Sequence, residues 1–157
     1  MRKSLFFVAT VLLTNLILFI FKQSIKDFIY INVLFFAGIY DYYKYIIPET
    51  AVITIIVLSI IDFKAENLLF SLVAFFSLLI FYRQRKIGFG DIQLISSIFF
   101  LNGYETLFIL AIACVLMIIL NFRKDTIRIP MGFYLMLGAT VFFISDLLIL
   151  GRCRLFF

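Results

Sequence analysis

The stretch L-F-I-L-A-I-A-C-V-L-M-I-I-L-N, from Leu107 to Asn121, decides the fold class because it carries no charged side chain. It lacks the alternation of apolar and polar residues that marks a membrane β-strand. Lipid offers the backbone no hydrogen-bond partners, so such a run must satisfy its own amide and carbonyl groups as a helix. The stretch therefore predicts a helix inside a membrane.

The whole chain has the same character. Of its 157 residues 65% are hydrophobic, and the mean hydropathy is +1.17. Soluble domains are about 45–50% apolar, and the polar surface that remains here is too small to cover a water-soluble globule. We therefore expect an all-α fold, a polytopic transmembrane helical bundle that forms one membrane-embedded domain over residues 1–157.

Charges and turn residues divide the chain into seven apolar segments, which predict about six to seven membrane spans. The opening Met1-Arg2-Lys3 and the run that follows resemble a signal peptide. No small-x-small cleavage site comes after them, so we expect a retained first span. The predicted segments are Leu5–Phe21, Phe28–Tyr40, Tyr45–Ile61, Leu68–Tyr82, Ile92–Leu101, Leu107–Asn121 and Met131–Leu150.

The basic residues are distributed unevenly between the two sides of such a bundle. The net charge is +5, and positive charge in a membrane chain marks cytoplasmic connections, which explains it without a nucleic acid partner. Alternate connections carry nine and five basic residues, so we place the richer set and the N-terminus in the cytoplasm and the C-terminus outside. The richer set is Arg2, Lys3, Lys44, Arg83, Arg85, Lys86, Arg123, Lys124 and Arg128. The poorer set is Lys22, Lys26, Lys64, Arg152 and Arg154. We assign the cytoplasmic cations to topology and to contact with lipid headgroups.

Several kinds of chemistry are excluded by residue content. The chain has no histidine, which removes Ser-His and Cys-His nucleophile pairs and His-ligated metals. Its two cysteines, Cys114 and Cys153, cannot alone build a tetrahedral zinc site, and they suggest no disulfide framework. We expect no metal and no cofactor.

Two acidic residues stand where apolar chains rarely tolerate them. Asp41 opens D-Y-Y-K-Y-I-I-P-E, and Asp91 closes G-F-G-D. An ionisable group in or beside a bilayer costs several kcal/mol unless it is partnered, which makes it a functional candidate. The charge distribution places both acids on the cytoplasmic face, so the two carboxylates can meet.

Each acid also has a plainer interpretation. Asp41 could be a solvated anchor among interfacial tyrosines. The second span is expected to continue through Asp41, and Pro48 then begins the next helix. Asp91 could be the N-cap of a helix after an ordinary turn. In the functional interpretation, Gly88 and Gly90 leave room for a peptide to approach the backbone as an added β-strand.

Taken together, the two acids predict an aspartyl dyad. Two carboxylates held close share one proton. The ionised one can take a proton from water, while the protonated one donates to the carbonyl of the bond to be broken. This chemistry needs no metal, histidine or cysteine.

The residues resemble the type IV prepilin peptidase family, the GxGD-type membrane aspartyl proteases, in three ordered segments. Asp41 to Glu49 resembles the first catalytic segment and G-F-G-D-I-Q-L the second. I-P-M-G-F-Y-L-M-L-G, Ile129 to Gly138, resembles the late segment that opens the last span. The resemblance implies that Asp41 and Asp91 are catalytic. It implies that the site is shaped by Gly88, Gly90, Pro48, Glu49, Pro130 and Gly132.

The resemblance also implies a function and a place. It implies cleavage of the basic leader from prepilins or pseudopilins at the cytoplasmic face of the bacterial inner membrane, for a type IV pilus or type II secretion system. Glu49 stands where Asn is usual, and Gln93 where Lys is usual. Met131, Phe133 and Tyr134 also depart from the late motif. The chain resembles the short form, which lacks the Cys-rich cytoplasmic insert, so the resemblance implies a peptidase and gives no strong grounds for methyltransferase activity.

Two alternatives remain at this point. A cation- or proton-coupled transporter would use Asp41, Asp91 and Asp146 as a path, with acids near the middle of the membrane and broken helices. An inactive structural relative in a pilus or secretion complex would need neither acid.

Overall fold

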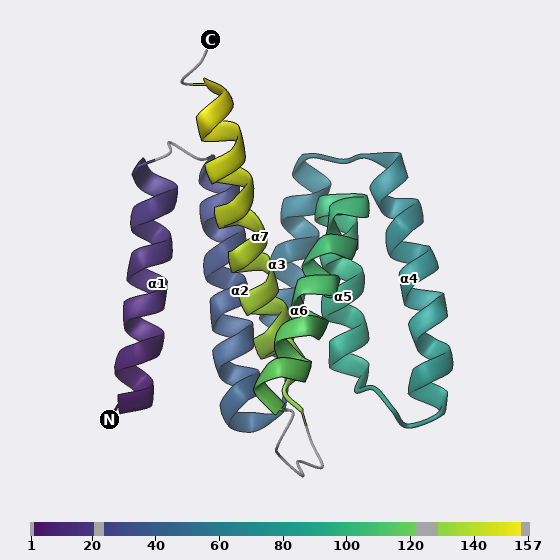
Figure 1. Cartoon of the computed structure of the whole chain (residues 1–157). Helices are drawn as coiled ribbons and strands as arrows, with labels where there is room; N and C mark the ends of the chain where they lie inside the picture. Colours follow the sequence, from purple (N-terminus) through teal and green to yellow (C-terminus); the bar gives the residue numbers. More distant parts are fainter. Residues whose placement is uncertain (1, 21–23, 122–128, 155–157) are drawn as a thin grey trace.

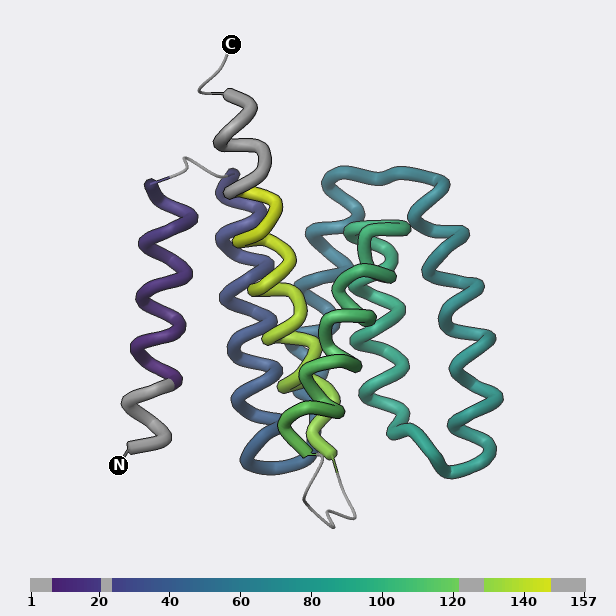
Figure 2. Tube along the Cα trace, in the orientation of Figure 1, coloured from purple at the N-terminus to yellow at the C-terminus, as the bar shows by residue number. Residues whose placement is uncertain are grey.

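The computed structural model is all-helical over the residues it describes (Figure 1). It describes the backbone of residues 2–20, 24–121 and 129–154, and the side chains of residues 7–20, 24–121 and 129–147. The helices run alternately up and down along the bundle (Figure 2). They are α1 (Arg2–Ile20), α2 (Ile25–Lys44), α3 (Glu49–Ile61), α4 (Ala65–Arg83), α5 (Phe89–Asn102), the 3₁₀-helix η1 (Gly103–Glu105), α6 (Thr106–Asn121) and α7 (Met131–Arg154).

Each predicted apolar segment overlaps one α-helix, but the third segment begins too early. The residues from Tyr45 to Ile47 are not helical, because Tyr45 adopts the left-handed conformation (φ 55°, ψ 35°) and ends α2. Pro48 then precedes α3 in an extended conformation, as predicted. The second helix continues through Asp41, also as predicted, and the fifth begins at Phe89, before Asp91. Lys22, Arg123, Lys124 and Arg128 lie outside the described residues.

The core lies between α2, α3, α5, α6 and α7. Leu34 of α2, Ile55 of α3, Ile98 of α5 and Leu135 of α7 are all almost completely buried and belong to one apolar cluster. Helices α1 and α4 stand at opposite edges (Figure 1). No residue of α4 is buried.

Polar side chains join neighbouring helices. Asn15 of α1 and Asn32 of α2 exchange two amide hydrogen bonds of 3.0 and 2.8 Å. Ser71 of α4 donates to the Ser96 carbonyl of α5 at 2.8 Å. Such bonds are favoured in an apolar medium because the groups would otherwise stay unpaired.

An ion pair joins the start of α2 to the end of α3, at the end of the bundle away from Asp41. Lys26, at the start of α2, lies 2.5 Å from the carboxylate of Asp62, just after α3. The hydrogen bond and the charge of Lys26 lower the pKa of Asp62. Both side chains reach solvent, so this pair contributes little to stability.

The outer surface of the bundle is apolar. Large side chains such as Phe76 of α4 and Ile119 of α6 are more than 60% exposed. Soluble monomers rarely expose apolar patches of this extent. Two apolar helical stretches, Ala65–Arg83 and Phe89–Asn121, are long enough by length and composition to cross a membrane. These features indicate membrane association.

The second of these stretches folds back on itself at Gly103. This residue has φ 59°, which favours glycine, and it ends α5. The Thr106 hydroxyl donates to the Ile98 carbonyl at 3.2 Å. In a straight helix these residues would be about 12 Å apart along the axis. Phe89–Asn121 therefore forms the hairpin of α5, η1 and α6.

Helix α7 packs closely against α6 because residue 138 has no side chain. A Cβ added to Gly138 would lie 2.6 Å from the Ile109 carbonyl oxygen and 3.0 Å from the Ala113 nitrogen. Both are backbone atoms of α6, which cannot move without the helix. The glycine sets the distance between α6 and α7.

We predict that Gly138→Ala destabilises the bundle by about 1–3 kcal/mol, because the added methyl group must push α6 and α7 apart. Thermal or denaturant unfolding in detergent measures the effect. Val141→Ala on the exposed face of α7 serves as control and should change stability by less than about 0.5 kcal/mol. Equal stability of Gly138→Ala and the wild type would contradict this account of the packing.

Candidate active site

Asp41 is a buried carboxylate held by another helix. It lies in the last turn of α2 and is 4% exposed. Its Oδ2 accepts a hydrogen bond of 2.8 Å from the backbone amide of Gly132. The carboxylate also accepts a weaker hydrogen bond from the backbone of Phe133. Gly132 is in the first turn of α7, where amides have no acceptor within their own helix. The Asp41 carboxylate thus takes over the role of an N-cap for α7 from a different helix.

Helix α2 ends one turn after Asp41, which places Asp41 at the end of the bundle. The Tyr45 amide donates to the Asp41 carbonyl at 2.8 Å, which closes the helix with a left-handed residue. Glycine is preferred at such a position, since a Cβ is crowded there. A tyrosine is therefore placed here at a conformational cost.

Asp91 lies in the first turn of α5, three residues after the N-cap. The N-cap is Gly88, in an extended conformation (φ −73°, ψ 150°), and not Asp91 itself. The Gly88 amide donates to Asp91 Oδ2 at 3.3 Å. A carboxylate is favoured in this position by the partial positive charge of the helix start. Asp91 is half-buried.

One cavity brings the two acids together. It has a volume of about 1030 Å³ and lies at the end of the bundle where α2, α4, α5, α6 and α7 meet. The carboxylates of Asp41 and Asp91 are close enough to interact electrostatically. The lining residues are Asp41, Tyr45, Tyr82, Arg83, Arg85, Lys86, Ile87, Gly88, Asp91, Met117, Ile129 and Met131.

The glycines of the predicted site have separate roles. A Cβ on Gly132 would lie 3.1 Å from Asp41 Oδ2, and one on Gly88 would lie 3.0 Å from Asp91 Oδ2. Each glycine leaves room for one carboxylate. Gly90 does not line the cavity, and a Cβ there would lie 3.3 Å from the Ile47 side chain.

The expected pairing of a peptide strand with the backbone at Gly88 does not agree with the structure. The Gly88 amide already donates to Asp91, and its carbonyl accepts from the Ile92 amide at 3.3 Å. Both groups are used within the helix start. A substrate must therefore be held by other groups of the cavity.

The remaining predicted residues lie outside the cavity. Pro48 is the N-cap of α3 and Glu49 is its first residue, which is exposed. Pro130 immediately precedes α7. Asp146 is exposed on α7, about 22 Å along the helix from Met131, so it does not join the two acids.

Several lining residues were not predicted. Tyr45, Tyr82, Met117, Ile129 and Met131 belong to the cavity wall, although Met131 and Ile129 fall inside the late motif. Tyrosine and apolar residues at these positions are typical of helix ends, so their sequence carries no separate signal. Among the described residues, no group of three or more His, Cys, Asp or Glu side chains could hold a metal ion.

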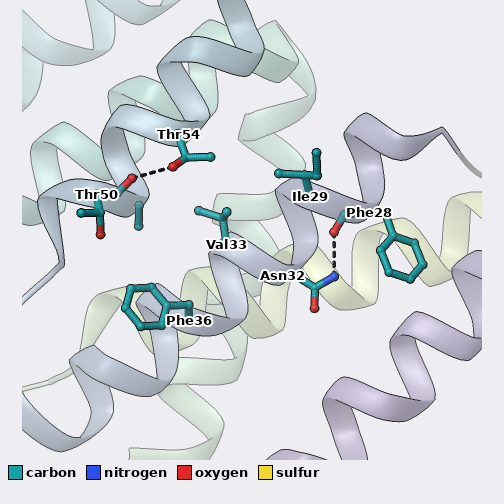
Figure 3. A pocket seen from close by; sticks show the side chains of 8 residues that line it. Phe28, Ile29, Asn32, Val33, Phe36, Thr50 and Thr54 are labelled. Carbon is teal, nitrogen blue, oxygen red and sulfur yellow. Dashed lines mark hydrogen bonds between the residues drawn. The ribbon is translucent and has the colours of Figure 1, made fainter.

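A second cavity, of about 360 Å³, lies between α2 and α3 (Figure 3). Its wall is mainly apolar. Two of its polar side chains already have partners. Thr54 donates to the Thr50 carbonyl, and Asn32 donates to the Phe28 carbonyl and also bonds to Asn15 of α1. Neither acid lines it, so it is not the candidate site.

We predict that Asp41→Ala loosens the first turn of α7. The Gly132 amide would lose its acceptor, and its hydrogen exchange should become about five to ten times faster, as for a lost helix cap. Hydrogen-exchange mass spectrometry of the α7 peptide measures this. Asp41→Asn keeps an acceptor oxygen and should restore most of the protection.

The control for this experiment is Asp91→Ala, because Asp91 bonds within α5 and not to α7. It should leave exchange at Gly132 unchanged. Equal protection of Gly132 in wild type and Asp41→Ala would show that the hydrogen bond does not hold α7.

Comparisons of this chain with protein-family models, with curated protein sequences and with solved structures give no match. The resemblance to the prepilin peptidases therefore depends on the three short segments alone. Their arrangement in space is the further observation that bears on it.

Proposed function

We propose that this chain is a membrane-embedded aspartic endopeptidase. The observation that carries the proposal is that Asp41 and Asp91, fifty residues apart in sequence, line one cavity. Two carboxylates in one water-accessible cavity are the minimal equipment for hydrolysis by an acid and a base. No other pair of acidic side chains lines that cavity among the described residues.

The proposed reaction is the hydrolysis of one peptide bond. The ionised carboxylate of the pair removes a proton from water as the oxygen attacks the carbonyl carbon. The protonated carboxyl group donates a hydrogen bond to the carbonyl oxygen, which becomes negatively charged in the tetrahedral intermediate. When the intermediate collapses the carbon–nitrogen bond breaks, and the carboxyl group that took the proton from water gives it to the departing amine. The other carboxyl group keeps its proton as the carbonyl forms again. The products are a carboxylic acid and an amine, and both acids regain their starting forms.

We propose further that the substrates are prepilins or pseudopilins. All three segments that resemble the prepilin peptidase family contribute to the same cavity: Asp41 from the first, Gly88 and Asp91 from the second, Ile129 and Met131 from the third. Gly132 of the third segment also binds Asp41. Chance matches at three distant places would not be expected to converge. The substrate would then carry a short basic leader before an apolar helix.

The proposed setting is the bacterial inner membrane, with seven spans and the cavity facing the cytoplasm. The alternating direction of the helices and their exposed apolar side chains support a multi-pass arrangement. The end of the bundle that holds Asp41 and Asp91 also holds Lys44, Arg83 and Lys86. These three belong to the nine basic residues that the sequence places on the cytoplasmic side. The positive-inside rule assigns that end to the cytoplasm.

The transporter alternative has less support. It would use Asp146 as a third acid of the path, yet Asp146 is exposed on the outer part of α7 and far from the cavity. No broken helix carries an acid in the middle of the described bundle. The peptidase is therefore the function that the geometry favours.

We predict that Asp41→Asn and Asp91→Asn each lower leader cleavage of a co-expressed prepilin by at least about 100-fold, since each removes an acid or base of the reaction. Asp146→Asn is the matched control and should cleave normally. Immunoblotting of precursor and mature pilin gives the readout, with the amount of enzyme measured in parallel. Normal cleavage by both dyad variants would refute the peptidase.

We predict that the two ends of α4 lie on opposite sides of the membrane. In a background with Cys114→Ser and Cys153→Ser, Lys64→Cys should react with a membrane-impermeant maleimide on intact cells. Gln84→Cys should react only after permeabilisation, because it would face the cytoplasm. Labelling of both cysteines from the same side would overturn the proposed topology.

A further inference from the structure

The cavity of the two acids carries a cationic rim. Arg83, Arg85 and Lys86, from the end of α4 and the turn after it, line the cavity together with Asp41 and Asp91. All three are exposed, and among the described residues none has a carboxylate within salt-bridge distance. Contact with lipid headgroups alone, as expected from the sequence, would not require them to face the two acids.

The backbone at this rim has a defined shape. The Lys86 amide donates to the Phe81 carbonyl at 3.1 Å, and the Arg85 amide donates to the Tyr82 carbonyl at 2.8 Å. These are the two bonds of a Schellman motif, in which the residue at the Arg85 position is left-handed and usually glycine. Arg85 has φ 56°. The turn therefore keeps an arginine where a glycine would be less strained.

A strained residue kept in a cavity suggests that its side chain is used there. Among the described residues, the non-glycine residues with positive φ are Tyr45 and Arg85, and both line this cavity. Arginine binds carboxylate and phosphate groups through paired hydrogen bonds. The side chain that the turn retains is thus suited to an anionic group.

Resting on the proposed function, we propose that Arg83, Arg85 and Lys86 select peptides that carry a carboxylate within a few residues of the bond to be cleaved. The buried end of the cavity is negative at Asp41 and its exposed rim is positive, so a bound peptide is oriented by its charges. A basic leader would be repelled from this rim. The carboxylate is the group that the rim would accept.

A peptide is favoured over a lipid as the source of the anion. The rim residues line the cavity where, under the proposed function, a peptide must be bound for cleavage. A lipid phosphate at the same place would compete with the substrate. The choice between peptide carboxylate and lipid phosphate is an outcome of the experiment below.

Arg85→Gly is the most informative change. It removes the cation while giving the left-handed position the residue that it favours, so the fold should be at least as stable. A purely structural role for residue 85 predicts no loss of any function. Arg85→Lys keeps the charge and should rescue part of the preference.

The experiment uses purified full-length enzyme in vesicles of neutral phosphatidylcholine and a set of leader peptides. In each pair of peptides one position near the bond carries either Glu or Gln. We expect the wild type to show a lower KM for one or more Glu peptides than for the matched Gln peptides. Arg85→Gly should reduce that ratio by about tenfold, as for a lost charge-assisted hydrogen bond.

Lys64→Gln, at the other end of α4, removes the same charge and should leave the ratio unchanged. No Glu preference at any position, or a preference that Arg85→Gly leaves intact, overturns the inference. So does an effect of Arg85→Gly that follows the content of anionic phosphatidylglycerol in the vesicles and is equal for Glu and Gln peptides.

Binding separates this inference from the proposed function. Fluorescence anisotropy with the same peptide pairs should show the Glu preference in wild type and its loss in Arg85→Gly, whether or not cleavage occurs. Preferential binding without cleavage would refute the peptidase and keep the anion site. Cleavage without preferential binding would keep the peptidase and refute the anion site.

Discussion

The hydrogen bond from the Gly132 amide to the Asp41 carboxylate connects residues 91 positions apart and determines how the site is built. A buried carboxylate without a donor is costly, and so is the first-turn amide of a helix without an acceptor. Each group satisfies the other. The bond fixes how far the end of α2 extends along the start of α7, and it leaves the acid facing the cavity. Glycine is favoured at 132 because a Cβ would lie only 3.1 Å from the carboxylate oxygen, so the Asp41 side chain would have to shift slightly.

Close approach of backbones holds the rest of α7 in place. A Cβ on Gly38 of α2 would lie 2.7 Å from the Cβ of Met136, and one on Gly138 would lie 2.6 Å from an α6 carbonyl. Helix α7 therefore approaches α2 closely at Gly38 and α6 closely at Gly138. In lipid, helices gain little from hiding apolar side chains from their surroundings, so tight packing and polar bonds must hold them together. The edge helices α1 and α4 have polar links of this second kind, at Asn15 and Ser71.

The helices could be predicted from sequence because each is a long apolar run between charges. The end of α2 was harder, since Tyr45 is apolar enough to continue a span and only its left-handed conformation stops the helix. The convergence of Asp41 and Asp91 at one end followed from counting alternate spans. Their common cavity did not, because it depends on how α2, α5 and α7 pack. Met117 has no chemical feature to mark it. In the sequence Arg85 is an ordinary topology signal, and its left-handed conformation depends on the turn after α4.

The size and charge of the cavity favour a peptide over a small ion. A cation or a proton path needs a narrow passage lined by acids, whereas this cavity measures about 1030 Å³ and has three cations at its rim. That volume is at the upper end of those that hold small ligands, about 300–1000 Å³. Cations at the entrance would repel the ions that a transporter must admit. A peptide with charges of both signs could instead use the whole surface, from the acids at the buried end to the arginines at the rim.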